Sequence, residues 1–112
     1  MPDLDTLLTL PGALAAFEIS DRGELASHKI APDSDVDESF LDMLGHVCVA
    51  NTSIATMQAR GWEKLTGMEG FYPISGFTMI GLDWSVVICC NTGVVMDNDN
   101  ADYQAAYDAL QS

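Results

Sequence analysis

Residues 36–65 read VDESFLDMLGHVCVANTSIATMQARGWEKL, and this stretch decides the fold. Some of its side chains recur at intervals of three or four, or next to one another, which places them on one face of an α-helix. These side chains are Phe40, Leu44, Val47, Cys48, Asn51, Ala55, Gln58, Trp62 and Leu65. The spacing predicts one long helix from about Val36 to Leu65.

The residues at the start of this stretch favour a helix, whereas its glycines weaken one. Asp35, Asp37 and Glu38 supply N-caps and negative charge, which stabilise the first turn of a helix. Gly45 and Gly61 each cost a helix about 1 kcal/mol relative to Ala. A bend or a close contact is therefore expected at either glycine.

The residues before the long helix predict a short helix followed by a β-hairpin. Leu4–Leu10 has leucines at helical spacing and stops at Pro11-Gly12, which cannot continue a helix. Ala13–Ser20 is short and apolar, and the turn 21–23 separates it from Glu24–Ile30, which has mixed polarity. Two short segments joined by a glycine turn are typical of a hairpin.

The residues after the long helix are typical of strands. Ser75–Leu82 is one candidate, and Trp84–Cys90 (WSVVICC) is a continuous apolar strand, as expected for a strand buried on both faces. The turn 91–93 then leads into a short strand, Val94–Met96. Ala101–Leu110 is expected to form the last helix.

Together these elements predict the order αββαβββα. The strand connections other than the long helix are of hairpin length, so we expect a mostly antiparallel five-stranded sheet with helices packed on its faces. This is an α/β (α+β) fold with a long central helix and two terminal helices. A chain of 112 residues predicts a single domain over residues 1–112.

Net charge limits the classes of partner. Seventeen acidic residues face four basic ones, for a net charge of −13. Nucleic-acid binding needs clustered Lys and Arg, and an anionic membrane surface would repel this chain, so we expect neither partner. No apolar run approaches the roughly 20 residues of a membrane helix, and the N-terminal MPDLD is acidic where a leader would be basic. These features predict a cytoplasmic protein.

Two segments carry a resemblance to a known family. LDTLLTLPGALAAFEISDRGEL (4–25) has a Leu-rich helix, a Pro-Gly-Ala stop and a strand that ends in Asp and Gly before Glu-Leu. SVVICCNTGVVMDN (85–98) is a strand pair with a short turn. With the long helix, the chain resembles the roadblock/dynein light chain family, of profilin-like fold, and more closely a family of small uncharacterised bacterial roadblock-like proteins.

The resemblance implies a homodimer. Roadblock domains pair the long helix and the third strand across a two-fold axis to form one continuous sheet. The 75–82 strand carries no charge, and an open apolar edge of this kind favours aggregation unless it is covered. The candidate dimer-interface residues are Cys48, Ala55, Phe77 and Met79, with Cys48 assigned either to the core or to a helix–helix contact.

The cysteines and histidines offer the few candidates for chemistry. Cys89 and Cys90 are candidate reactive thiols, but no Cys-x-x-Cys spacing and no nearby cation accompany them, so buried core thiols are expected. His28 and His46 do not combine with them into a recognisable catalytic set. The acidic 97–100 loop, together with Asp102, lacks the Gly and Glu of a calcium loop and is interpreted as helix capping. We expect no cofactor, no metal and no enzymatic activity.

Three hypotheses for function follow. The leading one is a non-catalytic homodimeric protein-interaction, regulatory or scaffold subunit that binds itself and a further protein. Because some roadblock domains regulate small GTPases, a narrower version acts on a small GTPase. The alternative is an accessory protein of bacterial sulfur or thiol metabolism with a reactive Cys, since the similar bacterial family is often linked with sulfur oxidation. Small-molecule binding in a profilin-like cleft is the third.

Overall fold

The computed structural model describes residues 3–111, and its elements follow the predicted order αββαβββα. In chain order they are α1 (Leu4–Leu7), β1 (Ala13–Ile19), β2 (Leu25–Ile30), α2 (Glu38–Thr66), β3 (Gly76–Ile80), β4 (Trp84–Cys89), β5 (Thr92–Asp97) and α3 (Tyr103–Gln111). None of the helices among residues 3–111 combines the length and the apolar character needed to cross a membrane.

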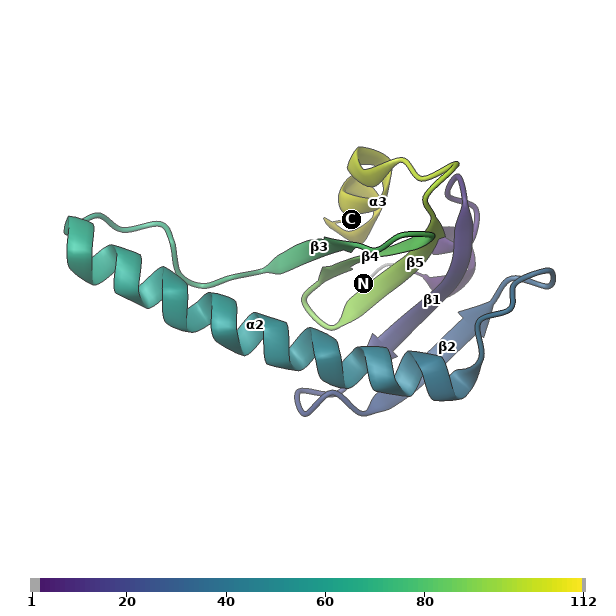
Figure 1. The fold of residues 1–112 in the computed structure, drawn as a ribbon, viewed down its shortest axis with the longest axis horizontal. Coiled ribbons are helices and arrows are strands. Elements are labelled where there is room, and N and C mark those ends of the chain that lie inside the picture. The colour runs from purple at the N-terminus through teal and green to yellow at the C-terminus, as the bar shows by residue number, and fades with distance from the viewer. Residues whose placement is uncertain (1–2, 112) are drawn as a thin grey trace.

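The five strands form one sheet in the order β2-β1-β5-β4-β3 (Figure 1). All four neighbouring pairs are antiparallel, as the hairpin-length connections predict. β4 lies between β5 and β3, so the expected interior position of the WSVVIC strand is confirmed. β2 and β3 are the two edges of the sheet.

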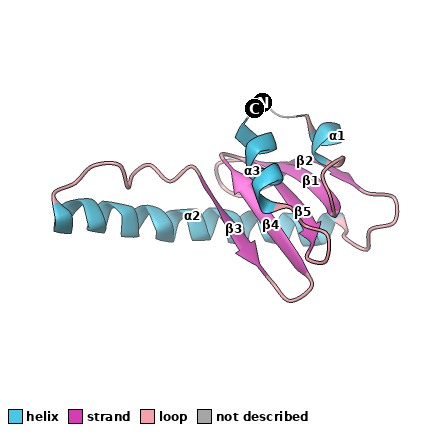
Figure 2. Ribbon diagram, turned by 90° about the horizontal axis from the view of Figure 1, so that it is seen from above, coloured by secondary structure: helices cyan, strands magenta, loops and turns pink. Residues whose placement is uncertain are grey.

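Helices cover both faces of the sheet and divide the core in two (Figures 1 and 2). α1 and α3 pack on one face, where Leu7, Val94 and Met96 are fully buried. α2 packs on the other face, against a cluster that contains Phe17 and Val86. Alternate residues of each strand serve the two clusters because successive side chains point to opposite faces.

The long helix is confirmed, with boundaries slightly later than predicted. Asp37 is its N-cap, and its carboxylate accepts the Phe40 N–H at 2.8 Å. At the other end Gly67 adopts φ 71°, a left-handed conformation that glycine takes without strain, and donates its N–H to the Glu63 carbonyl at 2.9 Å. The helix therefore has a cap at each end that the sequence itself provides.

Gly45 marks the close contact that its position in a helix suggested. A Cβ at this residue would lie 2.6 Å from the carbonyl oxygen of Gly23 and 2.8 Å from the side chain of Ile19. The turn between β1 and β2 thus lies directly against the helix backbone. Gly61, by contrast, has no atom within 4 Å of its Cβ position.

The second half of α2 extends beyond the sheet (Figures 1 and 2). At 1.5 Å per residue, its 29 residues span about 44 Å, which accounts for most of the 48 Å length of the molecule. The buried residues of α2 are Leu41, Leu44, Gly45, Cys48 and Ala59, so only Ala59 lies in the second half.

The segment that follows α2 returns along this overhanging half. The Glu63 carboxylate accepts the backbone N–H groups of Gly70 and Tyr72 at 3.2 and 3.4 Å. The Arg60 guanidinium lies 4.2 Å from the centre of the Tyr72 ring, in cation–π contact. These contacts cover one side of the overhang and leave the rest exposed.

The terminal helices differ from their predicted limits. α1 ends at Leu7, and a turn closed by Thr9 N–H to Thr6 carbonyl replaces the predicted final residues. α3 begins at Tyr103 because the Asp102 carboxylate caps it by accepting the Ala105 N–H at 3.0 Å. Local hydrogen bonds of this kind determine where each helix begins or ends.

Candidate interaction surface

β3 forms an open edge of the sheet. Among residues 3–111, only β4 pairs with it, in the register Phe77 opposite Ile88 and Met79 opposite Val86. Its sequence GFTMI carries no charge, whereas the opposite edge strand, β2, contains His28 and Lys29. Proteins usually protect edge strands with charge, and β3 lacks this protection.

The predicted interface residues of β3 point toward α2. Phe77 and Met79 are half-buried and pack against the α2-side core, and the Asn51 amide lies 4.0 Å from the Met79 sulfur. Thr78 and Ile80 point to the other face and are exposed, Ile80 by 62%. The backbone edge and these exposed side chains are what β3 offers to a partner. A contact of Phe77 or Met79 with a second copy stays a prediction.

The two predicted interface residues of α2 differ in exposure. Cys48 is 1% exposed and belongs to the core against the sheet, which is the first of its two expected positions. Burial raises the pKa of its thiol to about 11. Ala55 lies beyond the sheet and is half-buried. Cys48 therefore offers a second copy no surface, while Ala55 stays a prediction.

A second stripe runs along α2 and shares only Val47 with the predicted helix face. We call it the α2 stripe. Its members are Met43, Val47, Ala50, Ile54, Met57 and Gly61. They alternate in steps of four and three, the 3.5-residue period with which two helices pack along a common seam. Met43, Ile54 and Met57 are exposed by 68%, 55% and 73%.

The α2 stripe was not predicted from the sequence because the residues of the predicted helix face satisfied the same helical period. Small residues at two of its positions, Ala50 and Gly61, also lowered its apolar signal. The alternation of four and three itself is the signal that could have revealed it. In the structure the stripe lies in the open because the sheet covers the adjacent face, which contains Leu41, Leu44 and Cys48.

The adjacent cysteines of β4 have different environments. Cys89 is buried, and its sulfur accepts a hydrogen bond from the Gln111 side chain at 2.9 Å. Burial, together with the neighbouring Cys90, raises the pKa of the Cys89 thiol. Cys90 is exposed, so the prediction that both thiols are buried is wrong for Cys90. The strand ends at Cys89, and Cys90 begins the turn with φ 60°.

We expect alkylation of the native protein to distinguish the three thiols. Cys90 should react near neutral pH at about the rate of cysteine in an unstructured peptide because it is exposed. Cys48 and Cys89 should react only after unfolding, since both are buried and their pKa values are raised. Mass spectrometry after timed iodoacetamide treatment measures this order. Modification of Cys48 before Cys90 would contradict the described packing.

The histidines and the acidic loop do not converge on one site. His28 is half-buried on β2, and His46 on α2 is exposed with its Nδ1 2.8 Å from the Asp42 carbonyl. Within residues 3–111 no three His, Cys, Asp or Glu side chains approach one another closely enough to hold a metal ion. The Asp97 carboxylate accepts hydrogen bonds from the Asp99 N–H and the Asn100 side chain, so residues 97–100 organise their own turn. Asp102 caps α3 by accepting the Ala105 N–H, so the predicted capping role is confirmed for Asp102.

Comparisons with known proteins identify the family of the sequence and the type of fold. The family described as "Uncharacterized conserved protein (DUF2173)" matches residues 3–112. None of the curated protein sequences compared with the chain matches it significantly. The fold is that of roadblock/LC7 domains: a crystal structure of such a domain from Streptomyces avermitilis superposes with a TM-score of 0.75 at 10% identity, over 96% of this chain and 85% of that one.

Two structures of proteins named MglB have the same fold. The gliding protein MglB from Thermus thermophilus superposes with a TM-score of 0.70 at 20% identity, over 96% of this chain and 82% of that one. MglB from Myxococcus xanthus superposes with a TM-score of 0.61 at 17% identity, over 94% and 85% of the two chains. The predicted roadblock-like fold is confirmed.

Proposed function

The chain belongs to the family described as uncharacterized conserved protein (DUF2173), and from its roadblock fold we propose that it is a non-catalytic, homodimeric regulatory or scaffold subunit of the cytoplasm. Its work is to bind other proteins, and a small GTPase is the partner class that the fold favours. The single observation that carries the proposal is the position of two unprotected surfaces, the β3 edge and the α2 stripe, on consecutive elements.

A second copy would cover both surfaces in one contact. Antiparallel pairing of β3 with its copy satisfies the free backbone groups of the edge, while the α2 stripes pack across the same two-fold axis. Ala50 and Gly61 are small and would allow the two helix backbones to approach. The exposed Met43, Ile54 and Met57 would supply the apolar area that a stable dimer requires.

The regulatory role rests on the surface that remains after dimerisation. The chain carries a net charge of −13, none of it on the α2 stripe or β3, and this charge favours association with basic protein patches and accelerates it at low ionic strength. The gliding proteins named MglB share the fold at identities too low to transfer a partner, so the GTPase assignment is carried by the fold resemblance alone.

Binding to small GTPases tests the proposed partner class. Purified small GTPases of the source organism, loaded with GDP or with a non-hydrolysable GTP analogue, would be passed over immobilised dimer in surface plasmon resonance. We expect one of them to bind in one nucleotide state at least about tenfold more tightly than in the other. Equal binding in both states would contradict a regulatory contact with the GTPase switch segments.

The exposed Cys90 keeps the thiol hypothesis as a second candidate. Its left-handed conformation places it at the tip of the β4–β5 turn, beside the buried Cys89 with the two sulfurs 3.9 Å apart. An accessory role in thiol metabolism needs an activated thiolate, so alkylation of Cys90 well above the rate of a free peptide thiol would favour it. Alkylation of Cys90 at about the rate of cysteine in an unstructured peptide would count against this role.

A further inference from the structure

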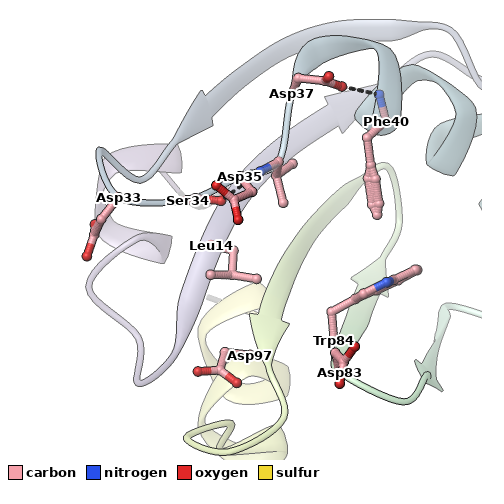
Figure 3. Close-up of a pocket in the computed structure, with 10 residues that line it drawn as sticks. Leu14, Asp33, Ser34, Asp35, Asp37, Phe40, Asp83, Trp84 and Asp97 are labelled. Carbon is pink, nitrogen blue, oxygen red and sulfur yellow. Dashed lines mark hydrogen bonds between the residues drawn. The ribbon is translucent and has the colours of Figure 1, made fainter.

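An open groove of about 410 Å³ lies where the start of α2 meets the β3–β4 turn (Figure 3). Its floor is apolar and contains Leu14, Val36, Phe40 and Trp84, all half-buried. The Phe40 and Trp84 rings meet edge to face with their centres 5.0 Å apart. This volume falls within the range typical of ligand pockets, and the indole of Trp84 gives it an aromatic wall.

All the charged residues that line the groove are acidic. Five aspartates line it: Asp33, Asp35, Asp37, Asp83 and Asp97. No Lys, Arg or His takes part in the lining. The rim therefore concentrates negative charge around an apolar, aromatic floor, a combination that suits a cation with an apolar stem.

Within residues 3–111, two of these five carboxylates are engaged in hydrogen bonds. Asp37 caps α2, and Asp97 holds the turn before α3. Throughout residues 3–111, the carboxylates of Asp33, Asp35 and Asp83 have neither a hydrogen bond nor an ion pair. A cation bound at the rim could therefore form ion pairs with carboxylates that have no such partner in the described chain.

Hydrogen bonds within the chain hold both walls of the groove. Asn98 donates its backbone N–H to the Asp83 carbonyl at 3.0 Å and its side-chain amide to the Gly81 carbonyl at 2.8 Å. The Ser34 hydroxyl accepts the Val36 N–H at 3.1 Å on the opposite wall. Both walls are thus positioned before any ligand binds, which lowers the entropic cost of binding.

We propose that this groove binds an arginine side chain presented by a partner protein. A guanidinium can stack flat on the Trp84 indole and form paired hydrogen bonds with carboxylates, and its three methylenes can lie on Leu14 and Val36. A lysine ammonium has neither the planar face nor the forked donors. The net charge of −13 would also steer a basic segment toward the molecule.

The arginine site goes beyond the proposed function, and none of the residues that line it belongs to the α2 stripe or to β3. It is complete within one chain, and it lies at the N-terminal end of α2, whereas the overhanging half lies at the other end (Figure 1). Two copies in a dimer would present two such grooves. A partner with two suitably spaced arginines would gain from binding both.

Peptide binding tests the groove directly. The probe is the peptide acetyl-Gly-Leu-Arg-Leu-Gly-amide, compared with the same peptide carrying citrulline, the neutral isostere of arginine. Fluorescence of the Trp62→Phe protein reports Trp84 alone, because these are the two tryptophans of the chain. We expect the arginine peptide to bind in the millimolar range or tighter, about tenfold more tightly than the citrulline peptide, and to bind more weakly at high salt.

Matched variants assign the binding to the rim. Asp33→Asn together with Asp35→Asn should weaken the arginine peptide about tenfold and leave the thermal unfolding midpoint unchanged, since neither carboxylate has a partner in the described chain. Glu69→Gln together with Asp108→Asn removes the same charge elsewhere and should leave binding unchanged.

Four results would overturn the proposal. They are equal binding of the two peptides, unchanged binding by the rim variant, no binding at millimolar peptide, and displacement of the peptide by spermidine at equal concentration. The last result would assign the groove to free organic cations.

Discussion

Met57→Asp should convert the protein from a dimer of about twice 12.1 kDa to a monomer of 12.1 kDa. Met57 is 73% exposed in one chain, so a single folded chain tolerates the aspartate. At the proposed helix–helix seam the same carboxylate would be buried without a partner, which costs on the order of 3 kcal/mol or more. A two-fold contact contains the substitution twice, so the affinity of one chain for the other should fall at least about a hundredfold.

Light scattering at micromolar concentration measures the change in mass. A matched control distinguishes loss of the interface from a general effect of added charge. Tyr107→Asp places the same charge at a 47% exposed apolar residue of α3, on the opposite face of the sheet. This control should stay dimeric, and both variants should keep the circular dichroism of the parent. A wild-type protein of 12.1 kDa, or a Met57→Asp protein of unchanged mass, would remove the α2 stripe as the interface.

Gly45→Ala should destabilise the protein, although alanine is the better helix former. The added methyl would lie 2.6 Å from the Gly23 carbonyl oxygen, and backbone cannot move aside as a flexible side chain can. Overpacking of this kind costs about 1–3 kcal/mol, against about 1 kcal/mol gained in helix propensity. The free energy of unfolding should therefore fall, and the melting temperature with it.

Gly61→Ala in the same helix is the control for this substitution. Nothing lies within 4 Å of its Cβ position, so the chain gains the propensity difference of about 1 kcal/mol without any clash. Urea unfolding of both variants in the monomeric Met57→Asp background isolates the effect from association. Equal free energies of unfolding for the two variants would contradict the close contact between α2 and the β1–β2 turn.

The order of the elements and the length of α2 could be predicted because they depend on local patterns. The helical period in residues 36–65 persists over many turns, and the apolar run 84–90 is too short and too rich in β-branched residues for a helix. The short turns at residues 21–23 and 91–93 indicate that the strands on either side of each turn form a hairpin. Where the structure differs, the difference is a matter of a few residues at an element end, where a capping side chain such as Asp102 decides.

The surfaces to which we assign function depend instead on which segments meet in space. Two faces of α2 have apolar residues at helical spacing: the face that contains Cys48 and the α2 stripe, which contains Met57. The way α2 lies on the sheet decides that the sheet covers the first face and leaves the second exposed. The exposure of Cys90 follows from the position of the β4–β5 turn, one residue earlier than the sequence pattern indicated.

The acidic groove could not be read from the chain at all. Its aspartates come from three segments distant in sequence, residues 33–37, Asp83 and Asp97, and each looks there like an ordinary turn or cap residue. Local periodicity thus determined the elements and their order, because helices and strands are made of neighbouring residues. The docking of α2 and the convergence of remote loops were decided only by tertiary packing, because the contacts that position them join residues with no relation in the sequence.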